Sequence, residues 1–187
     1  LTVGAAENYR TTGGYSTYRW GIELWPSDYP TNPIRSDYAS RPMSNNVQGL
    51  AAFSSRGPCN DGRIKPDIVA PGTDIVSTRS RRATDTGWGI GPNTNYLYMG
   101  GTSMATPLMA GAAGLARQWV TTAGGITNPS AALLKALLLN GARDMAPGQY
   151  LSGTKQEIFA RPDKSQGWGH VDLYNALQPA TNQFLDL

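Results

Sequence analysis

The sequence predicts an α/β fold, because short strand-like runs lead into long helical segments. Apolar runs at residues 64–70 and 74–78 flank the dipeptide Pro71-Gly72, a pattern typical of strands joined by a turn. A third β-like run, residues 95–99, leads through two glycines into residues 105–120, where Ala, Gly, Leu and Met recur on nearly every face. A helix that is apolar all round is buried, so we expect this one to pass through the middle of an α/β sandwich.

Composition indicates a soluble globular protein that forms one domain or part of one. The chain has 187 residues, of which 40% are hydrophobic and 16% charged, and no stretch is long and apolar enough to span a membrane. The net charge is +3, and the one basic cluster, residues 79–82, has no interleaved aromatic residues. We therefore expect a solvated loop there and no nucleic-acid site. The single cysteine, Cys59, excludes an internal disulfide and a cysteine-based metal cluster.

The first forty-six residues contain one strand and one long irregular segment. Residues 1–5 have the pattern of the end of a buried strand, so we expect the natural chain to begin further upstream. Residues 9–46 are rich in Gly, Pro, Ser and Thr and carry seven aromatic residues: Tyr9, Tyr15, Tyr18, Trp20, Trp25, Tyr29 and Tyr38. An exposed aromatic ridge could line a substrate groove or contact another domain. Inward packing that holds the loop together is the favoured alternative.

The remaining elements follow from local signals. Residues 50–55 predict a strand that stops at Arg56-Gly57-Pro58, and residues 80–95 predict a loop that carries Trp88. The tripeptide Asn128-Pro129-Ser130 predicts the start of a helix over residues 131–140, with Gly141 as its C′ residue. Residues 166–171 predict a glycine-flanked strand, after which Asp172 caps a short helix through Leu177 that Pro179 ends.

The strand–glycine–helix segment places Ser103 at or just inside a helix N-terminus. The unpaired N–H groups and the positive dipole end there stabilise an oxyanion, as a nucleophilic serine requires. The alternative is an ordinary N-cap serine, which the Gly-Thr-Ser tripeptide alone would favour.

The longer motifs decide between these interpretations. Residues 100–107, Gly-Gly-Thr-Ser-Met-Ala-Thr-Pro, followed by an Ala/Gly helix, closely resemble the serine motif of subtilisin-like serine proteases. Residues 53–58 (Phe-Ser-Ser-Arg-Gly-Pro) and 65–72 (Lys-Pro-Asp-Ile-Val-Ala-Pro-Gly) are similar to what this family carries upstream of its serine. The resemblance implies the C-terminal part of a three-layer sandwich with a mostly parallel sheet and a central buried helix starting at Ser103. It covers residues 1–187 apart from the aromatic loop, which looks like an enlargement found in larger subtilases with an extra C-terminal β domain.

The resemblance also implies the chemistry. Ser103 would be the nucleophile of a peptide-hydrolysing triad and its N–H an oxyanion donor, with the Thr102 hydroxyl as a secondary contributor. Oxidation of Met104 would hamper activity. The family order is Asp, His, oxyanion Asn and then Ser, yet no Asp-Ser-Gly, Asp-Thr-Gly or His-Gly-Thr motif precedes Ser103. The only histidine, His170, follows the serine and is interpreted as structural. We therefore expect the C-terminal half of a catalytic domain that is inactive alone, in a secreted parent that acts on peptides or proteins.

Other expectations concern cofactors and rival functions. Subtilases often hold calcium, which makes Asp67 a candidate ligand, although a salt-bridged or turn-stabilising Asp67 is favoured. No organic cofactor is expected. A non-catalytic, pseudo-protease binding module is the alternative function, and the intact Thr-Ser-Met sequence argues against it. An α/β-hydrolase would need Gly-x-Ser-x-Gly, whereas Ala105 stands where the last glycine belongs.

Overall fold

Two parallel strands that are distant in sequence form the centre of the structure. The computed structural model describes residues 1–24, 40–150, 153 and 156–178. Strand β1 (Val3–Ala6) pairs in parallel with β2 (Ile68–Pro71), in a register that sets Val3 opposite Ile68. Single bridges widen this pair on both sides, with Leu50 beside β1 and His170 beside β2. The predicted α/β class is confirmed, with the parallel pair as its core.

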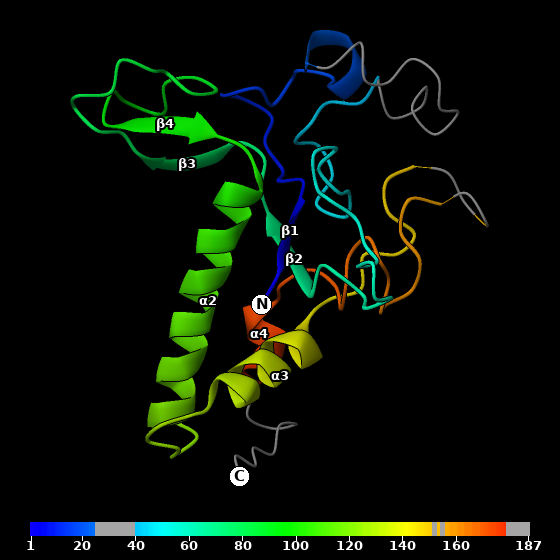
Figure 1. Ribbon diagram of the computed structural model, residues 1–187. Helices are drawn as coiled ribbons and strands as arrows, with labels where there is room; N and C mark the ends of the chain where they lie inside the picture. Colours follow the sequence, from blue (N-terminus) through cyan, green and yellow to red (C-terminus); the bar gives the residue numbers. More distant parts are fainter. Residues whose placement is uncertain (25–39, 151–152, 154–155, 179–187) are drawn as a thin grey trace.

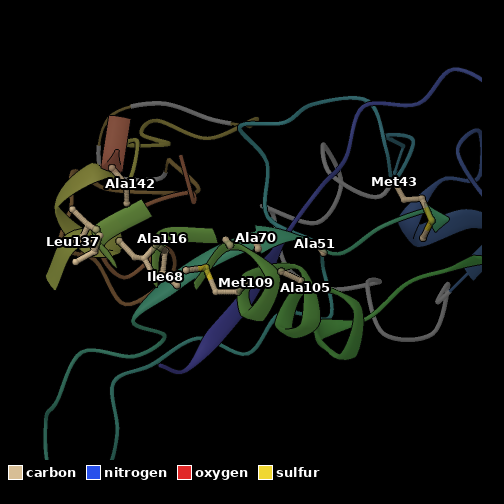
Figure 2. Close-up of a cluster of buried hydrophobic side chains, with 14 of the residues drawn as sticks. Met43, Ala51, Ile68, Ala70, Ala105, Met109, Ala116, Leu137 and Ala142 are labelled. Carbon is tan, nitrogen blue, oxygen red and sulfur yellow. The ribbon is translucent and has the colours of Figure 1, made fainter. Parts of the chain in front are cut away.

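Helix α2 (Thr102–Thr122) covers the parallel pair on one side. Its buried side chains recur every three or four residues, which places them on one face of the helix. They are Ala105, Met109, Ala112, Ala116 and Val120. This face shares one cluster of buried side chains with Ala5, Ile68 and Ala70 of the two strands. Figure 2 shows Ile68 and Ala70 beside Met109 of the helix. Small residues on both sides let the helix lie close to the sheet.

The opposite face of α2 is open, so the prediction of a helix buried on every face is wrong for the described chain. Leu108 is 43% exposed and Leu115 is 57% exposed. A Cβ placed on Gly111 or Gly114 would meet nothing within 4 Å among the described residues. The reason is that the described elements packed on α2, namely β1, β2, α3 and α4, leave this face uncovered. A three-layer sandwich is therefore not formed by these residues alone.

A β-hairpin leads into α2. Strands β3 (Ile75–Thr78) and β4 (Tyr96–Met99) pair antiparallel, with Ile75 opposite Met99 (Figure 1). The prediction of a mostly parallel sheet therefore holds for β1 and β2 but not for this second pair. A surface loop connects β3 directly to β4, so these two strands run in opposite directions. The loop holds the basic residues 79–82, and the Arg79 guanidinium donates hydrogen bonds to carbonyls within it, which agrees with the loop prediction.

The shorter helices begin where their capping residues predict. Helix α3 (Ala131–Gly141) begins after Ser130, whose hydroxyl accepts the N–H of Leu133 at 3.1 Å. Helix α4 (Leu173–Ala176) begins after Asp172, which accepts the N–H of Asn175 at 2.9 Å. A π-helical turn, η1 (Trp20–Leu24), lies within the predicted loop. None of the helices in the described ranges combines the length and apolar character needed to cross a membrane.

Gly141 differs from its predicted role. It was expected as a C′ residue beyond the helix, but it is the last residue of α3, and Ala142 is the C-cap. A Cβ at Gly141 would lie 2.4 Å from the backbone of Ala176 in α4. Glycine is therefore required by the close approach of two helices and not by the helix ending. Pro179, predicted to end α4, lies outside the described residues.

Two predicted strands are reduced to single bridges. In residues 50–55, only Leu50 bridges β1, because the chain turns when Ser54 N–H donates to the Ala51 carbonyl at 2.9 Å. The Ser54 hydroxyl then accepts the N–H of Ala5 in place of a ladder bond. In residues 166–171 the bridges are isolated: His170 bridges Val69 and Arg143, and Gly167 bridges Asp163. In the first segment a side-chain acceptor and a turn compete with the ladder, and in the second a turn, from Gly169 N–H to the Gln166 carbonyl, precedes the bridge at His170.

The Gly141 contact can be tested with a matched pair of glycines. We expect Gly141→Ala to lower the free energy of unfolding by about 1–3 kcal/mol, because the new methyl group overlaps α4. In residues 1–187 alone, where the site is open, Gly111→Ala should raise it by roughly 0.5–1 kcal/mol through helix propensity. Urea unfolding followed by circular dichroism measures both. Equal effects of the two substitutions would contradict the packing argument.

Candidate active site

Ser103 lies in the first turn of α2 with an exposed side chain. The helix begins at Thr102, one residue before the predicted start, and its N-cap is Gly101, which offers no side-chain cap. Ser103 is therefore the second helical residue and does not cap the helix. Its hydroxyl has no hydrogen-bond partner among the described residues, which leaves it free for chemistry.

The backbone around Ser103 leaves its N–H uncommitted. The carbonyl of Gly101 accepts the N–H groups of Met104 at 3.0 Å and Ala105 at 3.3 Å. The N–H of Ser103 has no backbone acceptor within the described ranges, as expected so near a helix start. This N–H and the positive end of the helix dipole lie beside the hydroxyl. Pro107 has no N–H to give the Ser103 carbonyl.

Two hydrogen bonds tie the serine turn to the carboxyl end of the parallel pair. The N–H of Gly101 donates to the Gly72 carbonyl at 2.8 Å, and the N–H of Gly72 donates to the Ala6 carbonyl at 2.9 Å. Gly101 has a φ of 145°, a backbone conformation that side-chain-bearing residues rarely adopt. The turn after β2 and the glycine before the helix thus position Ser103 relative to the sheet.

Trp88 packs directly on the glycine that precedes this turn. A Cβ at Gly100 would lie 1.7 Å from Cη2 of Trp88. The N–H of Trp88 also donates to the carbonyl of Tyr98 in β4 at 2.8 Å. The indole stacks on Tyr15 with ring centres 5.3 Å apart and meets Phe53 edge-on at 6.4 Å. The loop of residues 80–95 is therefore fixed against the strand that leads to Ser103.

The aromatic residues of the long loop are divided between the interior and the surface. Trp20 is fully buried and meets Phe53 edge-on at 5.7 Å, which agrees with the favoured inward packing. Tyr15 is half-buried and stacks on Tyr18, which is 41% exposed. Tyr9 is 65% exposed. The remaining three, Trp25, Tyr29 and Tyr38, lie outside the described residues.

His170 is held in the sheet and not beside the serine. Its backbone bridges Val69 and Arg143, and its ring Nδ1 lies 2.9 Å from the Val171 carbonyl. Burial lowers the pKa of the imidazole, and its Nε2 has no hydrogen-bond partner among the described residues. Within the same residues no interaction joins His170 to Ser103. The geometry agrees with the structural role predicted for this histidine.

The carboxylate of Asp67 is occupied by protein cations. Oδ1 accepts from the ammonium groups of Lys65 at 2.8 Å and Lys135 at 3.1 Å, and Oδ2 accepts the N–H of Thr2 at 2.7 Å. Burial would raise the pKa of this carboxyl, but these three hydrogen bonds outweigh it and lower the pKa to about 2. Two ammonium groups stand where a metal would bind, so the site does not fit calcium and the salt-bridged alternative fits well. The described residues contain no group of three or more metal-ligating side chains.

Several buried carboxyls were not singled out from the sequence. Asp74 is fully buried in the turn after β2, where Oδ1 accepts the N–H of Tyr15 at 2.7 Å and Oδ2 accepts the hydroxyl of Ser44 at 2.6 Å. Burial raises its pKa. Glu7, directly after β1, is also fully buried, and Glu157 is almost so. The one available signal was position, since Glu7 and Asp74 follow the carboxyl ends of apolar strands.

Comparison with known proteins identifies the class. The family model described as the subtilase family, Peptidase_S8, matches residues 1–169. The chain belongs to this family of subtilisin-like serine proteases, so the resemblance inferred from the sequence motifs is confirmed.

Individual relatives are considerably longer than this chain. It is 39% identical over 179 residues to the serine protease/ABC transporter B family protein tagD of Dictyostelium discoideum, covering 85% of this chain and 10% of that protein. It is 35% identical over 173 residues to pyrolysin of Pyrococcus furiosus, covering 92% and 10%. The serine protease AprX of Bacillus subtilis is 39% identical over 123 residues, covering 59% and 25%. The chain thus spans a tenth to a quarter of the length of these relatives.

Among solved structures, the CspB protease of Clostridium perfringens is similar to the chain with a TM-score of 0.49 and 29% identity. The match covers 68% of this chain and 22% of that one.

The contact between Trp88 and Gly100 leads to a prediction. Gly100→Ala should lower the free energy of unfolding by about 1–3 kcal/mol, because the methyl group and the indole cannot share the same space. Quenching of tryptophan fluorescence by acrylamide should increase in the variant as Trp88 is displaced. Gly114→Ala, at a helix position that is open in residues 1–187, is the control in this chain and should neither lower the free energy of unfolding nor increase the quenching. Unchanged quenching in Gly100→Ala would refute the contact.

The Asp67 network gives a pH-dependent prediction. Because the pKa is about 2 in the folded protein and 3.8 ordinarily, the carboxylate stabilises the fold above pH 3.8, and this contribution is lost as the pH falls toward 2. Asp67→Asn should therefore be less stable at neutral pH, by about 1–2 kcal/mol. The difference should shrink below about pH 4 in urea titrations. Stabilisation of the unaltered protein, but not the variant, by added calcium would instead support a cation site.

Proposed function

We propose that the protein is a serine endopeptidase that hydrolyses peptide bonds through an acyl-enzyme on Ser103. The observation that carries the proposal is that Ser103, which lies in a sequence motif of the protease family, is exposed and its hydroxyl makes no hydrogen bond among the described residues. Its hydroxyl is exposed, it does not cap the helix, and its own N–H is uncommitted. The Asp and His of the triad are assigned to chain upstream of residue 1.

The proposed reaction begins when the upstream histidine takes the proton of the Ser103 hydroxyl. The serine oxygen forms a bond to the peptide carbonyl carbon, and the Ser103 N–H donates to the oxyanion that results. The Thr102 hydroxyl is a second candidate donor, one residue away. Collapse breaks the C–N bond, and the amine leaves with the proton from the histidine. Water then attacks the ester and releases the acid.

The open face of α2 supports the assignment of an upstream half. Leu108 and Leu115 expose apolar side chains there, and Gly111 and Gly114 allow close approach of a neighbour. We assign this face to contact with the upstream part of the catalytic domain, which would complete the three-layer sandwich. Secretion and a peptide or protein substrate complete the proposal, and both rest on family membership.

A fluorophosphonate probe tests the proposal, because it reacts only with activated serine nucleophiles. The full-length protein should be labelled at Ser103, and Ser103→Ala should abolish both labelling and peptide hydrolysis. Residues 1–187 alone should react slower by orders of magnitude, because the base is missing. Thr106→Ala, which removes an exposed hydroxyl one turn further along α2, is the control and should be labelled normally. A folded full-length protein that is not labelled would overturn the proposal in favour of a non-catalytic module.

A further inference from the structure

The buried carboxyl group of Glu7 lies at the carboxyl end of strand β1. Glu7 directly follows this strand and its side chain is fully buried. Its Oε1 accepts two hydrogen bonds, from Nε1 of Trp20 at 2.8 Å and from Nε2 of Gln149 at 2.9 Å. The carboxyl therefore joins the end of β1 to Trp20 on one side and to Gln149 on the other.

Two acceptor atoms in this contact have no donor. Oε2 of Glu7 and Oε1 of Gln149 are both buried and without a hydrogen-bond partner among the described residues. They belong to the same two groups that share the bond from Nε2 to Oε1. An ionised carboxylate and an amide oxygen can only accept, so both would keep their full desolvation cost.

One proton satisfies both atoms. We propose that Glu7 is a neutral carboxylic acid in the folded protein, and that its Oε2–H donates to Oε1 of Gln149. The carboxyl and the amide then form two antiparallel hydrogen bonds in a closed ring. The second N–H of the Gln149 amide is already used, because Nε2 also donates to the Leu50 carbonyl at 3.4 Å. Every polar atom of the pair is then satisfied.

The surrounding charges favour the neutral form. The second buried carboxyl, Glu157, faces Glu7 and repels its charge. Arg56 lies 3.8 Å from Glu157, and no ion pair to Glu7 occurs among the described residues. The backbone N–H of Asn45 faces the Glu7 carboxyl and acts in the opposite direction, because it favours the charged form. Burial is the main cause that raises the pKa of Glu7 to about 8, with Glu157 adding to it against the hydrogen bonds from Gln149 and Trp20.

Glu157 is bound in a different way, which makes it a matched control. Its Oε1 accepts the N–H of Leu50 at 3.1 Å and its Oε2 accepts the N–H of Gln149 at 2.8 Å. Both oxygens thus receive fixed backbone donors, and an amide at this position would turn its NH₂ against one of them. Glu7 has one oxygen without a donor among the described residues, whereas both oxygens of Glu157 accept a backbone N–H.

The acid–amide pair makes this end of the sheet sensitive to pH. The unfolded chain releases the Glu7 proton near its ordinary pKa of 4.5, whereas the folded protein keeps it to about pH 8. The folded state therefore binds more protons between these values, so stability falls as the pH rises through this window and levels off above it. Alkaline conditions should loosen the junction between β1, Trp20 and Gln149.

Substitution of Glu7 by glutamine imitates the proposed acid, since the new NH₂ takes the place of Oε2–H. In the full-length protein, Glu7→Gln should match the unaltered protein near pH 4.5 and unfold at higher urea concentration near pH 8.5. Its midpoint should lack the downward slope between these values. Glu157→Gln should unfold at lower urea concentration across the whole range.

Infrared spectroscopy provides a second readout that does not depend on stability. The unaltered protein near pH 6.5 should show the carbonyl stretch of one protonated carboxylic acid, absent in Glu7→Gln and lost as the pH rises past about 8. Loss of stability in Glu7→Gln at every pH would overturn the proposal, because it would show that the site needs a carboxylate. Absence of the acid band near pH 6.5 would overturn it as well.

Discussion

The hydrogen bond from Gly101 N–H to the Gly72 carbonyl joins the start of helix α2 to the turn after strand β2. On one side, Gly72 is bound to Ala6, so the turn after β2 is fixed to the end of β1. On the other side, Gly101 is the N-cap of α2, whose buried face lies on the same two strands. The position of Ser103 therefore follows from the parallel pair, because the turn and the helix are both held by it. Gly101 makes this geometry possible through a φ that a side chain would strain.

Buried carboxyl groups at the carboxyl ends of β1 and β2 bind residues of the aromatic loop. Glu7 accepts from the Trp20 indole, and Asp74 accepts from the Tyr15 N–H. Each is bound through hydrogen bonds, with no ion pair to either carboxyl among the described residues, and burial raises the pKa of both groups. Asp67, at the opposite end of β2, shows the contrasting case, since two lysines lower its pKa. The carboxyl groups at the two ends of β2 therefore have pKa values shifted in opposite directions.

Sequence reasoning succeeded where the signal is local and failed where it depends on packing. The Ser130 and Asp172 caps, the Pro71-Gly72 turn and the helix after Ser103 follow from residue types at fixed spacing. The strands expected at residues 50–55 and 166–171 were wrong, because a side-chain acceptor and a turn interrupt the ladder in the first and a turn leaves only isolated bridges in the second. Gly141 looked like a helix stop, although its role depends on the distant Ala176. The buried carboxyls were missed because a partner such as Gln149, 142 residues from Glu7, leaves no local pattern.

The proposed role of Ser103 as a nucleophile has two physical requirements, and the described chain contributes to one of them. An oxyanion is stabilised by fixed N–H groups and a helix dipole, and these depend only on the local turn at Gly101 and on α2. Removal of the hydroxyl proton instead needs a base within hydrogen-bond distance, and His170 is held in the sheet by its bridges to Val69 and Arg143. The first requirement is therefore met in part by this part of the chain, since the side-chain oxyanion donor of the family is expected elsewhere, and the second needs a further segment placed against it. Because the open face of α2 begins within two turns of Ser103, a segment that covered this face would also lie near Ser103.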